Sequence, residues 1–320
     1  TYTGNGGTQS ITSLDFAPSL CWIKNRTQAY NNSLFDIIRG VGVRLQSDDT
    51  PGDNAMSDGL TAFNSDGFSV GANSQVNKAS QNIVSWNWKA GTSFTNDASA
   101  TGIGSIDSTG SVNTDAGFSI VKWTVGSAVN GLAVAHSLGV APKIIIYKRT
   151  NSSSDWYVWL NKVIDSSQDY LVLNTTSAKV DINSGTYGIP SSTLISNFGF
   201  ANTEMIAYCF AEKQGYSKFG SYTGNGNADG TFCYLGFKPA WVMTKRTDGT
   251  AGWHMQDNKR NGFNYQNYRL FANTNASSTE NSRMDLLSNG FKYRDGDGNH
   301  GTNIYMAFAE NPFVTSTGVP

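Results

Sequence analysis

Histidine and glutamate are scarce in this chain, which limits the acid–base and metal chemistry that its side chains can offer. The histidines lie far apart in the sequence, and none has a partner at the spacing of a metal site or a catalytic triad: His136, His254 and His300. Glycosidases use paired carboxylates, but the chain has only these glutamates: Glu204, Glu212, Glu280 and Glu310. The sequence therefore predicts no catalytic residues and no enzyme activity.

Two of the glutamates occupy one position of an internal repeat, because both follow Phe-Ala, in Phe210–Glu212 and Phe308–Glu310. They are expected to lie in different modules, so they cannot form a catalytic pair within one module. Their recurrence indicates a structural role, and one hypothesis is an ion pair with the recurrent Lys148 or Lys245.

One short segment carries oxygen ligands at a spacing that suits calcium: Asp295, Asp297 and Asn299 alternate with glycines. It lacks the later bidentate glutamate of an EF-hand, and the other repeats do not carry it. A glycine-rich hairpin tip with Asx turns is the favoured interpretation. The sequence thus predicts no cofactor, with calcium as the alternative.

Aromatic side chains are the best candidates for ligand contacts, since flat rings stack on flat partners such as sugar faces. The densest cluster contains Trp156 and Trp159, and Trp253 occupies the equivalent place later in the chain. A hydrophobic residue at a repeated position is more often part of the core, so binding is the less favoured reading for these. The polar aromatic segment 264–269 is the favoured contact surface, through Tyr265, Asn267, Tyr268 and Arg269.

The composition indicates short strands joined by tight turns. Charged residues make up 15% of the 320 residues, against roughly 25% for an average soluble protein. Glycine is abundant (34) and aromatics are 12%, which suits strands and turns better than helices. The net charge of −1 gives no indication of nucleic-acid binding, and no apolar run is long enough to predict membrane insertion. An odd count of three cysteines argues against a disulfide framework.

An internal repeat organises the chain. The pentapeptide Tyr-Thr-Gly-Asn-Gly occurs at residues 2–6 and 222–226, with a degraded copy from Trp123. After each copy comes a proline, and six residues after that proline stands a lysine: Pro18 and Lys24, Pro142 and Lys148, Pro239 and Lys245. Repeats must be recognised first, because they decide the fold.

The repeats predict an all-β chain of three tandem antiparallel β-sandwich, jelly-roll-like modules. The expected boundaries are 1–91 for the first, 117–213 for the divergent second and 214–320 for the third. Residues 92–116 are rich in Ser, Thr, Gly and Asp and are expected to form a linker or a surface connection. The first module lacks the strand that precedes the pentapeptide in the others, which suggests that something precedes residue 1. Serial sandwiches would form a rod; the alternative is pseudo-threefold packing that replaces a homotrimer.

The third module in particular resembles a repeat module found in tail-fibre and other structural proteins of tailed bacteriophages, notably marine ones. The resemblance is carried by Tyr222–Gly226, by Lys245-Arg246 and by Ala307–Phe313 (Ala-Phe-Ala-Glu-Asn-Pro-Phe). It implies a location on the virion, with assembly in the host cytoplasm, rather than an activity.

Three functions follow as hypotheses. The first is a tail-fibre or adhesin-like protein that binds a host-surface glycan. The second is a purely structural virion protein, a capsid decoration or a fibre shaft, whose partners are other virion proteins or copies of itself. A polysaccharide depolymerase ranks third.

Overall fold

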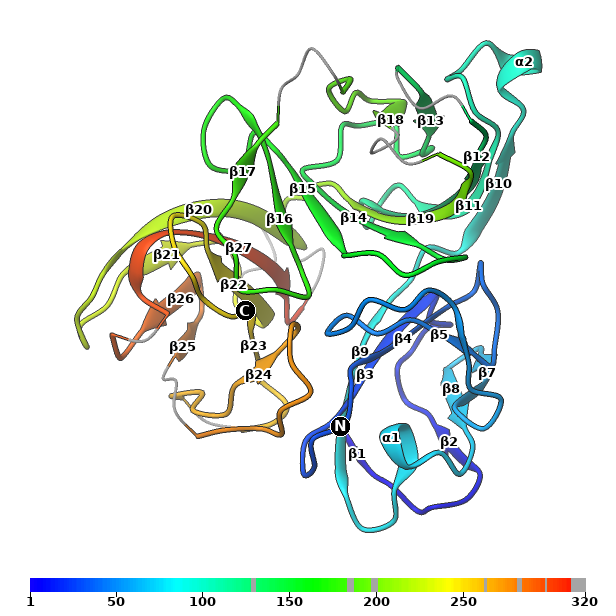
Figure 1. The fold of residues 1–320 in the computed structure, drawn as a ribbon. Helices are drawn as coiled ribbons and strands as arrows, with labels where there is room; N and C mark the ends of the chain where they lie inside the picture. The colour runs from blue at the N-terminus through cyan, green and yellow to red at the C-terminus, as the bar shows by residue number, and fades with distance from the viewer. Residues whose placement is uncertain are drawn as a thin grey trace.

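A computed structural model describes residues 1–127, 131–182, 187–196, 201–261, 264–280, 284–296 and 298–311. Hydrogen-bonded sheets divide the described strands into three groups, which we call units 1, 2 and 3 (Figure 1). The predicted all-β, antiparallel sandwich fold is confirmed, since every pairing between the named strands is antiparallel.

Unit 1 contains a main sheet, a smaller sheet, a strand pair and one helical turn. The main sheet has the order β1 (Tyr2–Thr3), β9 (Asn82–Trp88), β3 (Leu20–Asn25), β4 (Ser33–Asp36). The smaller elements are β2 (Gln9–Ile11), β8 (Gly67–Val70) and β7 (Leu60–Asn64) in one sheet, the pair β5 (Val43–Arg44) and β6 (Asn54–Ala55), and α1 (Ser74–Asn77).

Units 2 and 3 repeat this plan with longer main sheets. The main sheet of unit 2 has the order β10 (Thr92–Asn96), β11 (Ser108–Asn113), β12 (Phe118–Val125), β19 (Thr203–Phe210), β14 (Ile144–Arg149), β15 (Tyr157–Asn161), β16 (Gln168–Val172), β17 (Val180–Asp181). Its other elements are the pair β13 (Ala133–Ala135) and β18 (Leu194–Ser196), and α2 (Ala98–Thr101). Unit 3 has β20 (Ser217–Asn225), β27 (His300–Ala309), β22 (Pro239–Arg246), β23 (His254–Asp257), β24 (Leu270–Phe271), and a small sheet of β21 (Phe232–Tyr234), β26 (Gly290–Tyr293), β25 (Met284–Leu287).

The linker predicted for residues 92–116 is wrong, because this segment contains the paired strands β10 and β11. They extend the main sheet of unit 2 beyond β12. Small polar residues suit an edge hairpin of this kind, since one of its faces is open to solvent. Composition alone cannot separate such a hairpin from a linker.

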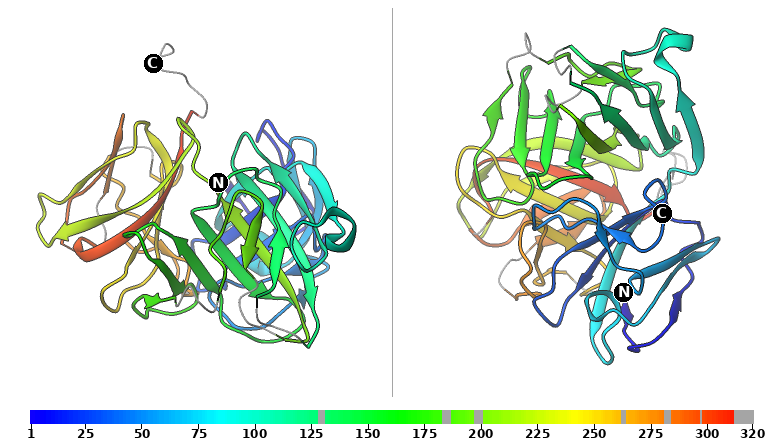
Figure 2. Two further views of the ribbon diagram at one scale, coloured as in Figure 1. Left: turned by 90° about the horizontal axis from the view of Figure 1, so that it is seen from above. Right: turned by 45° about the vertical axis from the view of Figure 1, so that its right-hand side comes forward.

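One hydrophobic core is shared by all three units. Each main sheet presents one face to a common centre, where Trp88 of unit 1, Phe210 of unit 2 and Phe308 of unit 3 make edge-on ring contacts with centroids 5.7–6.2 Å apart. The opposite face of each main sheet packs against a separate core within its own unit. The units therefore lie side by side around a centre, as Figure 2 shows, and the predicted rod is wrong.

The recurrent lysines join the units. Each is fully buried and donates from Nζ to a carbonyl of a neighbouring unit: Lys148 to Thr50 (2.7 Å), Lys245 to Thr176 (3.2 Å) and Lys24 to Asn275 (2.9 Å). Unit 2 thus binds unit 1, unit 3 binds unit 2, and unit 1 binds unit 3. The contacts close a ring, which is the pseudo-threefold alternative to the rod.

Two further sets of hydrogen bonds repeat around the ring. Eight residues after each lysine, a side-chain N–H donates to the preceding unit in the ring: Trp156 Nε1 to Gln46 O (2.7 Å), Trp253 Nε1 to Val172 O (3.0 Å) and Asn32 Nδ2 to Phe271 O (3.2 Å). In the opposite direction, a backbone N–H of the preceding unit donates to a backbone carbonyl of the unit that carries the lysine: Asp53 N to Thr150 O (2.6 Å), Lys179 N to Thr247 O (2.8 Å) and Ser278 N to Arg26 O (2.9 Å). We call each contact between two neighbouring units a joint. The hydrogen bonds at each joint pair polar groups of one unit with polar groups of the next.

The hypothesis of an ion pair between these lysines and the recurrent glutamates is wrong. Glu212 accepts a hydrogen bond from Phe219 N (2.8 Å), and Glu310 pairs with Lys238 (2.7 Å). Burial without a carboxylate at Nζ lowers the pKa of Lys148 and of Lys245 to about 8. Carbonyl oxygens thus take the place that the hypothesis gave to carboxylates.

Buried ion pairs reinforce two of the three joints. In unit 1 Arg39 Nε lies 2.6 Å from Asp36 Oδ2, and Tyr208 of unit 2 donates to the same oxygen (2.8 Å). The same arrangement holds Arg260 against Asp257 (2.6 Å) in unit 3, with Trp86 of unit 1 as the donor (3.1 Å). At the third joint the equivalent residues are apolar: Leu160 and Val163 of unit 2 and Met306 of unit 3. All three belong to the shared hydrophobic core.

Candidate functional site

The tryptophans considered as ligand contacts are all buried, so that interpretation is wrong. Trp156 and Trp159 have no exposed surface and Trp253 is 1% exposed. Trp156 and Trp253 belong to the joints described above. Trp159 lies inside unit 2, where its Nε1 donates to Gln168 Oε1 (2.7 Å). A repeated position therefore marked the core here.

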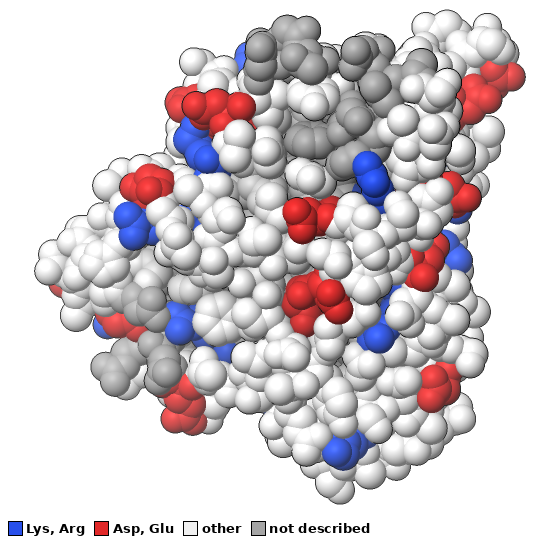
Figure 3. All heavy atoms as spheres, viewed as in Figure 1, with Lys and Arg blue, Asp and Glu red and all other residues white. Residues whose placement is uncertain are grey.

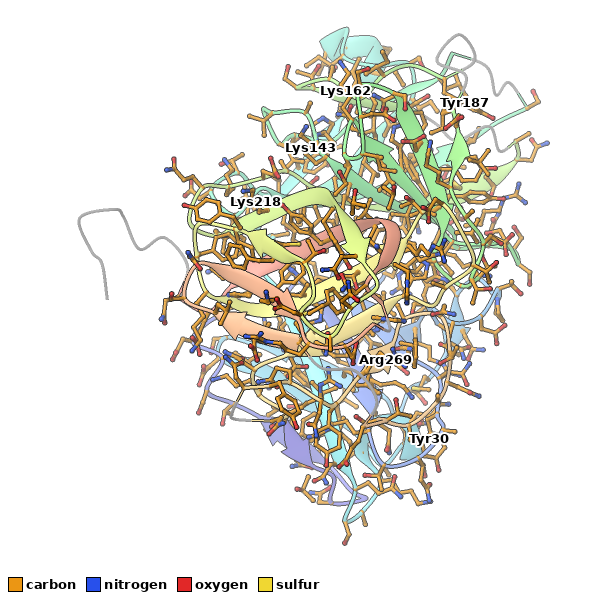
Figure 4. The ribbon with its side chains drawn as sticks, turned by 90° about the vertical axis from the view of Figure 1, so that its left-hand side faces the viewer. Tyr30, Lys143, Lys162, Tyr187, Lys218 and Arg269 are labelled. Carbon is orange, nitrogen blue, oxygen red and sulfur yellow. The ribbon has the colours of Figure 1, made fainter. Side chains whose placement is uncertain are left out.

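The segment 264–269 is divided between surface and interior. Tyr265 is 44% exposed, whereas Arg269 is buried and stacks over the Phe271 ring at 4.7 Å. Tyr268 donates a hydrogen bond to Glu280, and Asn267 accepts one from Asn261 Nδ2 (2.8 Å). Figure 4 shows Arg269 on the side of unit 3 that faces unit 1. Only Tyr265 of the four predicted contacts is thus prominently exposed.

The oxygen-rich segment after Asp295 holds the pentapeptide loop. Asn299 is fully buried, and its Nδ2 donates to Asn225 Oδ1 (2.7 Å), while Gly226 N donates to Asn299 O (2.7 Å). In unit 1 Asn77 does the same for Asn5 (3.0 Å). A Cβ on Gly224 would lie 2.2 Å from the Asn299 carbonyl carbon, so the pentapeptide needs its glycine for close approach. The motif is therefore structural, because it fixes the pentapeptide loop against Asn299.

The calcium hypothesis finds no support in the residues that the structure places. Asp297 lies outside the described residues, and the side chain of Asn299 is buried and hydrogen-bonded to Asn225. In the described parts of the chain no three His, Cys, Asp or Glu side chains gather as metal ligands.

One sequence pattern of hydrolases also has a structural explanation. Residues 67–71 match Gly-x-Ser-x-Gly, in which the serine sits on a turn between a strand and a helix. Here Ser69 lies within β8 and shares a hydrogen bond with Ser10 Oγ (3.0 Å). Unit 1 contains no histidine that could act as its base.

An exposed aromatic surface lies on the small sheet of unit 3. The strand β21 alternates, with Cys233 buried and Phe232 and Tyr234 exposed by 42% and 61%. The sheet continues through β26 and β25, and a bridge between Gln266 and Met284 adds the segment that contains Tyr265. We call Phe232 and Tyr234 the aromatic face.

The register places these rings on a continuous outer surface. Phe232 pairs with Lys292, which pairs with Asp285, and Tyr234 pairs with Gly290. Gly290 lies against the Phe232 ring, because a Cβ at this position would meet Phe232 Cε2 at 3.0 Å. The small sheet lies on the side of unit 3 away from the other units (Figure 1).

Charged side chains around the aromatic face neutralise one another. Lys292 lies 2.8 Å from Asp229, and Arg294 Nε lies 2.5 Å from Asp285. The Lys218 ammonium lies 5.1 Å from the centre of the Tyr234 ring, a cation–π contact, and Figure 4 shows it at the surface. On the face of the molecule drawn in Figure 3, acidic and basic groups are likewise small and intermixed. The surroundings thus offer hydrogen-bonding groups without a strong field.

The equivalent surface of unit 1 carries no aromatic rings. Aligning Phe291 with Phe68 places Ser10 and Thr12 where unit 3 has Phe232 and Tyr234. Large rings at these positions are therefore unnecessary for the fold. The sequence analysis missed Phe232 and Tyr234 because they lie in a segment that is typical of an ordinary strand. An alignment of the repeats would have shown large rings in unit 3 at positions where unit 1 has Ser10 and Thr12.

Comparisons with known proteins give one match. The model of a domain of unknown function, DUF7483, matches residues 1–312, which include all the described strands. No curated protein and no solved structure matches the chain. The helices of the described segments are single turns, and none could cross a membrane.

Proposed function

Since this chain belongs to the DUF7483 family, a family defined without a function, we propose a function from its surface: it is a non-enzymatic, adhesin-like protein of a bacteriophage virion that binds a host-surface glycan. The observation that carries the proposal is the aromatic face, two exposed rings on the outer side of β21. Rings with uncovered faces stack on the apolar faces of sugars, and neighbouring charged groups can hydrogen-bond hydroxyls.

The assignment to a virion rests on the sequence resemblance to tail-fibre modules. A ring of β-units around one shared hydrophobic core would suit display on a particle. The small free volume at the centre, about 10 Å³ and lined by apolar side chains, leaves no room there for a ligand. Binding is therefore assigned to the outside.

The test replaces the rings by the residues that unit 1 carries. The variant Phe232→Ser with Tyr234→Thr should lose glycan affinity by about ten-fold or more, because a ring contact contributes about 0.5–1.5 kcal/mol. A glycan array identifies the ligand, and titration calorimetry on the best glycan measures the change. The melting temperature should stay near that of the wild type.

The matched control is Ile189→Ser, which removes an exposed apolar residue (52%) from unit 2. It should leave glycan affinity unchanged. A wild-type chain that binds no glycan on the array, or a double variant with undiminished affinity, would contradict the proposal.

The second candidate is a purely structural virion protein, as a capsid decoration or fibre shaft. The same exposed rings favour it, because an exposed apolar group on a sheet can be buried against a protein partner. Imaging of the assembled particle separates the candidates. An aromatic face covered by a neighbouring subunit would support the structural function, and an aromatic face that points away from the particle would support attachment.

A further inference from the structure

One pocket of unit 3 is lined by basic and imidazole side chains. Its volume is about 110 Å³, enough for a few water molecules or one small ion, since a water occupies about 30 Å³. It lies where β22 ends, between β23 and β27, and its lining includes Lys245, Arg246, His254, Gly298 and His300. We call it the Lys245 pocket.

The lysine in this pocket is held less completely than its counterpart in unit 2. Lys148 Nζ has three acceptors, Thr50 O (2.7 Å), Ser154 O (2.9 Å) and Ser154 Oγ (3.2 Å). Lys245 Nζ donates to Thr176 O at 3.2 Å and to Arg246 O at 2.7 Å. An ammonium has three N–H donors, and the described residues supply no third acceptor at Lys245.

The walls of the pocket add positive and hydrogen-bonding groups. His254 is buried, whereas His300 is exposed at the opening. Gly298 has φ +77°, and a Cβ there would lie 2.9 Å from His254 Nδ1, so only a glycine fits this close to the ring, which Phe271 contacts edge-on at 5.2 Å. None of the described lining residues is acidic. The nearest acidic partner that the structure records is Asp248, which pairs with Arg246 (2.6 Å) at the rim.

These observations describe a small, partly enclosed site with a buried ammonium that lacks one partner. Burial lowers the pKa of Lys245 to about 8, so it is mostly protonated at neutral pH. A compact anion would supply the missing acceptor and offset the loss of hydration at the ammonium.

We infer that the Lys245 pocket binds a compact oxyanion, either a free ion such as sulfate or phosphate or the acidic group of a charged sugar. This site is separate from the aromatic face, because it is built from the main sheet of unit 3. The inference therefore stands whether or not the aromatic face binds a neutral glycan.

The experiment is titration calorimetry of the full chain with sodium sulfate, sodium phosphate, glucose 6-sulfate and glucuronate, with glucose as the uncharged reference. At least one anion should bind and glucose should not. Lys245→Met should lower the affinity at least about ten-fold, because it removes the charged hydrogen-bond donor of the pocket. The matched control Lys148→Met removes the lysine at the same repeat position of unit 2, whose Nζ already has three acceptors, and should leave anion affinity unchanged.

A second variant guards against misfolding of Lys245→Met. His300→Gln changes an exposed residue, so it should keep the wild-type melting temperature and still weaken anion binding. Tighter binding of a charged sugar than of the free ions would assign the site to a glycan, and equal or weaker binding would assign it to the ion; both support the inference. Absence of binding by every anion, or binding that neither variant weakens, would overturn it.

Discussion

Trp156→Ala should lower the free energy of unfolding by about 3–5 kcal/mol, the usual cost of deleting a large buried ring. Trp156 has no exposed surface and donates from Nε1 to Gln46 O and Asp49 O of unit 1, at 2.7 and 3.2 Å. The variant therefore leaves a cavity and two carbonyls without their donor. Urea unfolding followed by tryptophan fluorescence and by circular dichroism measures the change.

Trp156→Phe is the partial control, because it keeps most of the ring and removes only the N–H. It should cost less, about 1–3 kcal/mol for the buried carbonyl groups left unsatisfied. A Trp156→Ala variant with the wild-type unfolding midpoint would contradict the expected contribution of this contact between units 1 and 2.

The second large effect is expected at the ion pair between units 1 and 2. Asp36→Ala should lower the free energy of unfolding by about 3–5 kcal/mol, because it removes the closer and fully buried carboxylate of Arg39 and leaves only the partly exposed Asp53, at 3.2 Å. Arg39 has no exposed side-chain surface, and Asp36 Oδ2 also accepts the Tyr208 hydroxyl. Chemical denaturation at constant ionic strength checks this expectation.

Unit 2 supplies the control for this prediction. At the equivalent joint the chain has Leu160, Val163 and Met306 in place of the ion pair and the tyrosine. The triple variant Asp36→Leu, Arg39→Val, Tyr208→Met should therefore recover much of the lost stability, since replacing a buried ion pair by apolar residues is often neutral. The partly exposed Asp53 loses its Arg39 partner in this variant and can be hydrated by solvent. A triple variant less stable than Asp36→Ala, or a single variant as stable as the wild type, would falsify this account.

The sequence predicts the strands and the repeats well because both depend on local patterns. Alternation of apolar residues, Asx-Gly turns and three prolines at one repeat position all act within a few residues. The recurrent lysines were recognisable too, but their partners were not. A lysine of one unit meets a carbonyl of another, and backbone carbonyls leave no signature in the residue types.

The candidate site was less predictable because it depends on which face of a strand is covered. For Trp156 and Trp253 the sequence favoured the core and left ligand binding as the alternative, and the neighbouring units bury both rings. For Phe232 and Tyr234 the sequence made no prediction, and both point outward from an edge strand. The same physical rule decides both cases: burial belongs to the assembled sheets, whereas a single strand shows only that its sides differ.

The joints of the ring have a consequence for how many ligands one molecule can engage. A single unit that carried both halves of a joint would close with two further copies of itself, and such a homotrimer must show every surface feature three times. When the three units are joined in one chain, their outer surfaces can differ from one another. The joints keep one geometry although unit 1 has Asn32 where units 2 and 3 have a tryptophan, and unit 2 has Leu160 and Val163 where the others have an ion pair. Among the described residues, the prominently exposed aromatic side chains all belong to unit 3. If the aromatic face binds the proposed glycan, each chain offers that surface once, and avidity comes from the number of chains displayed together.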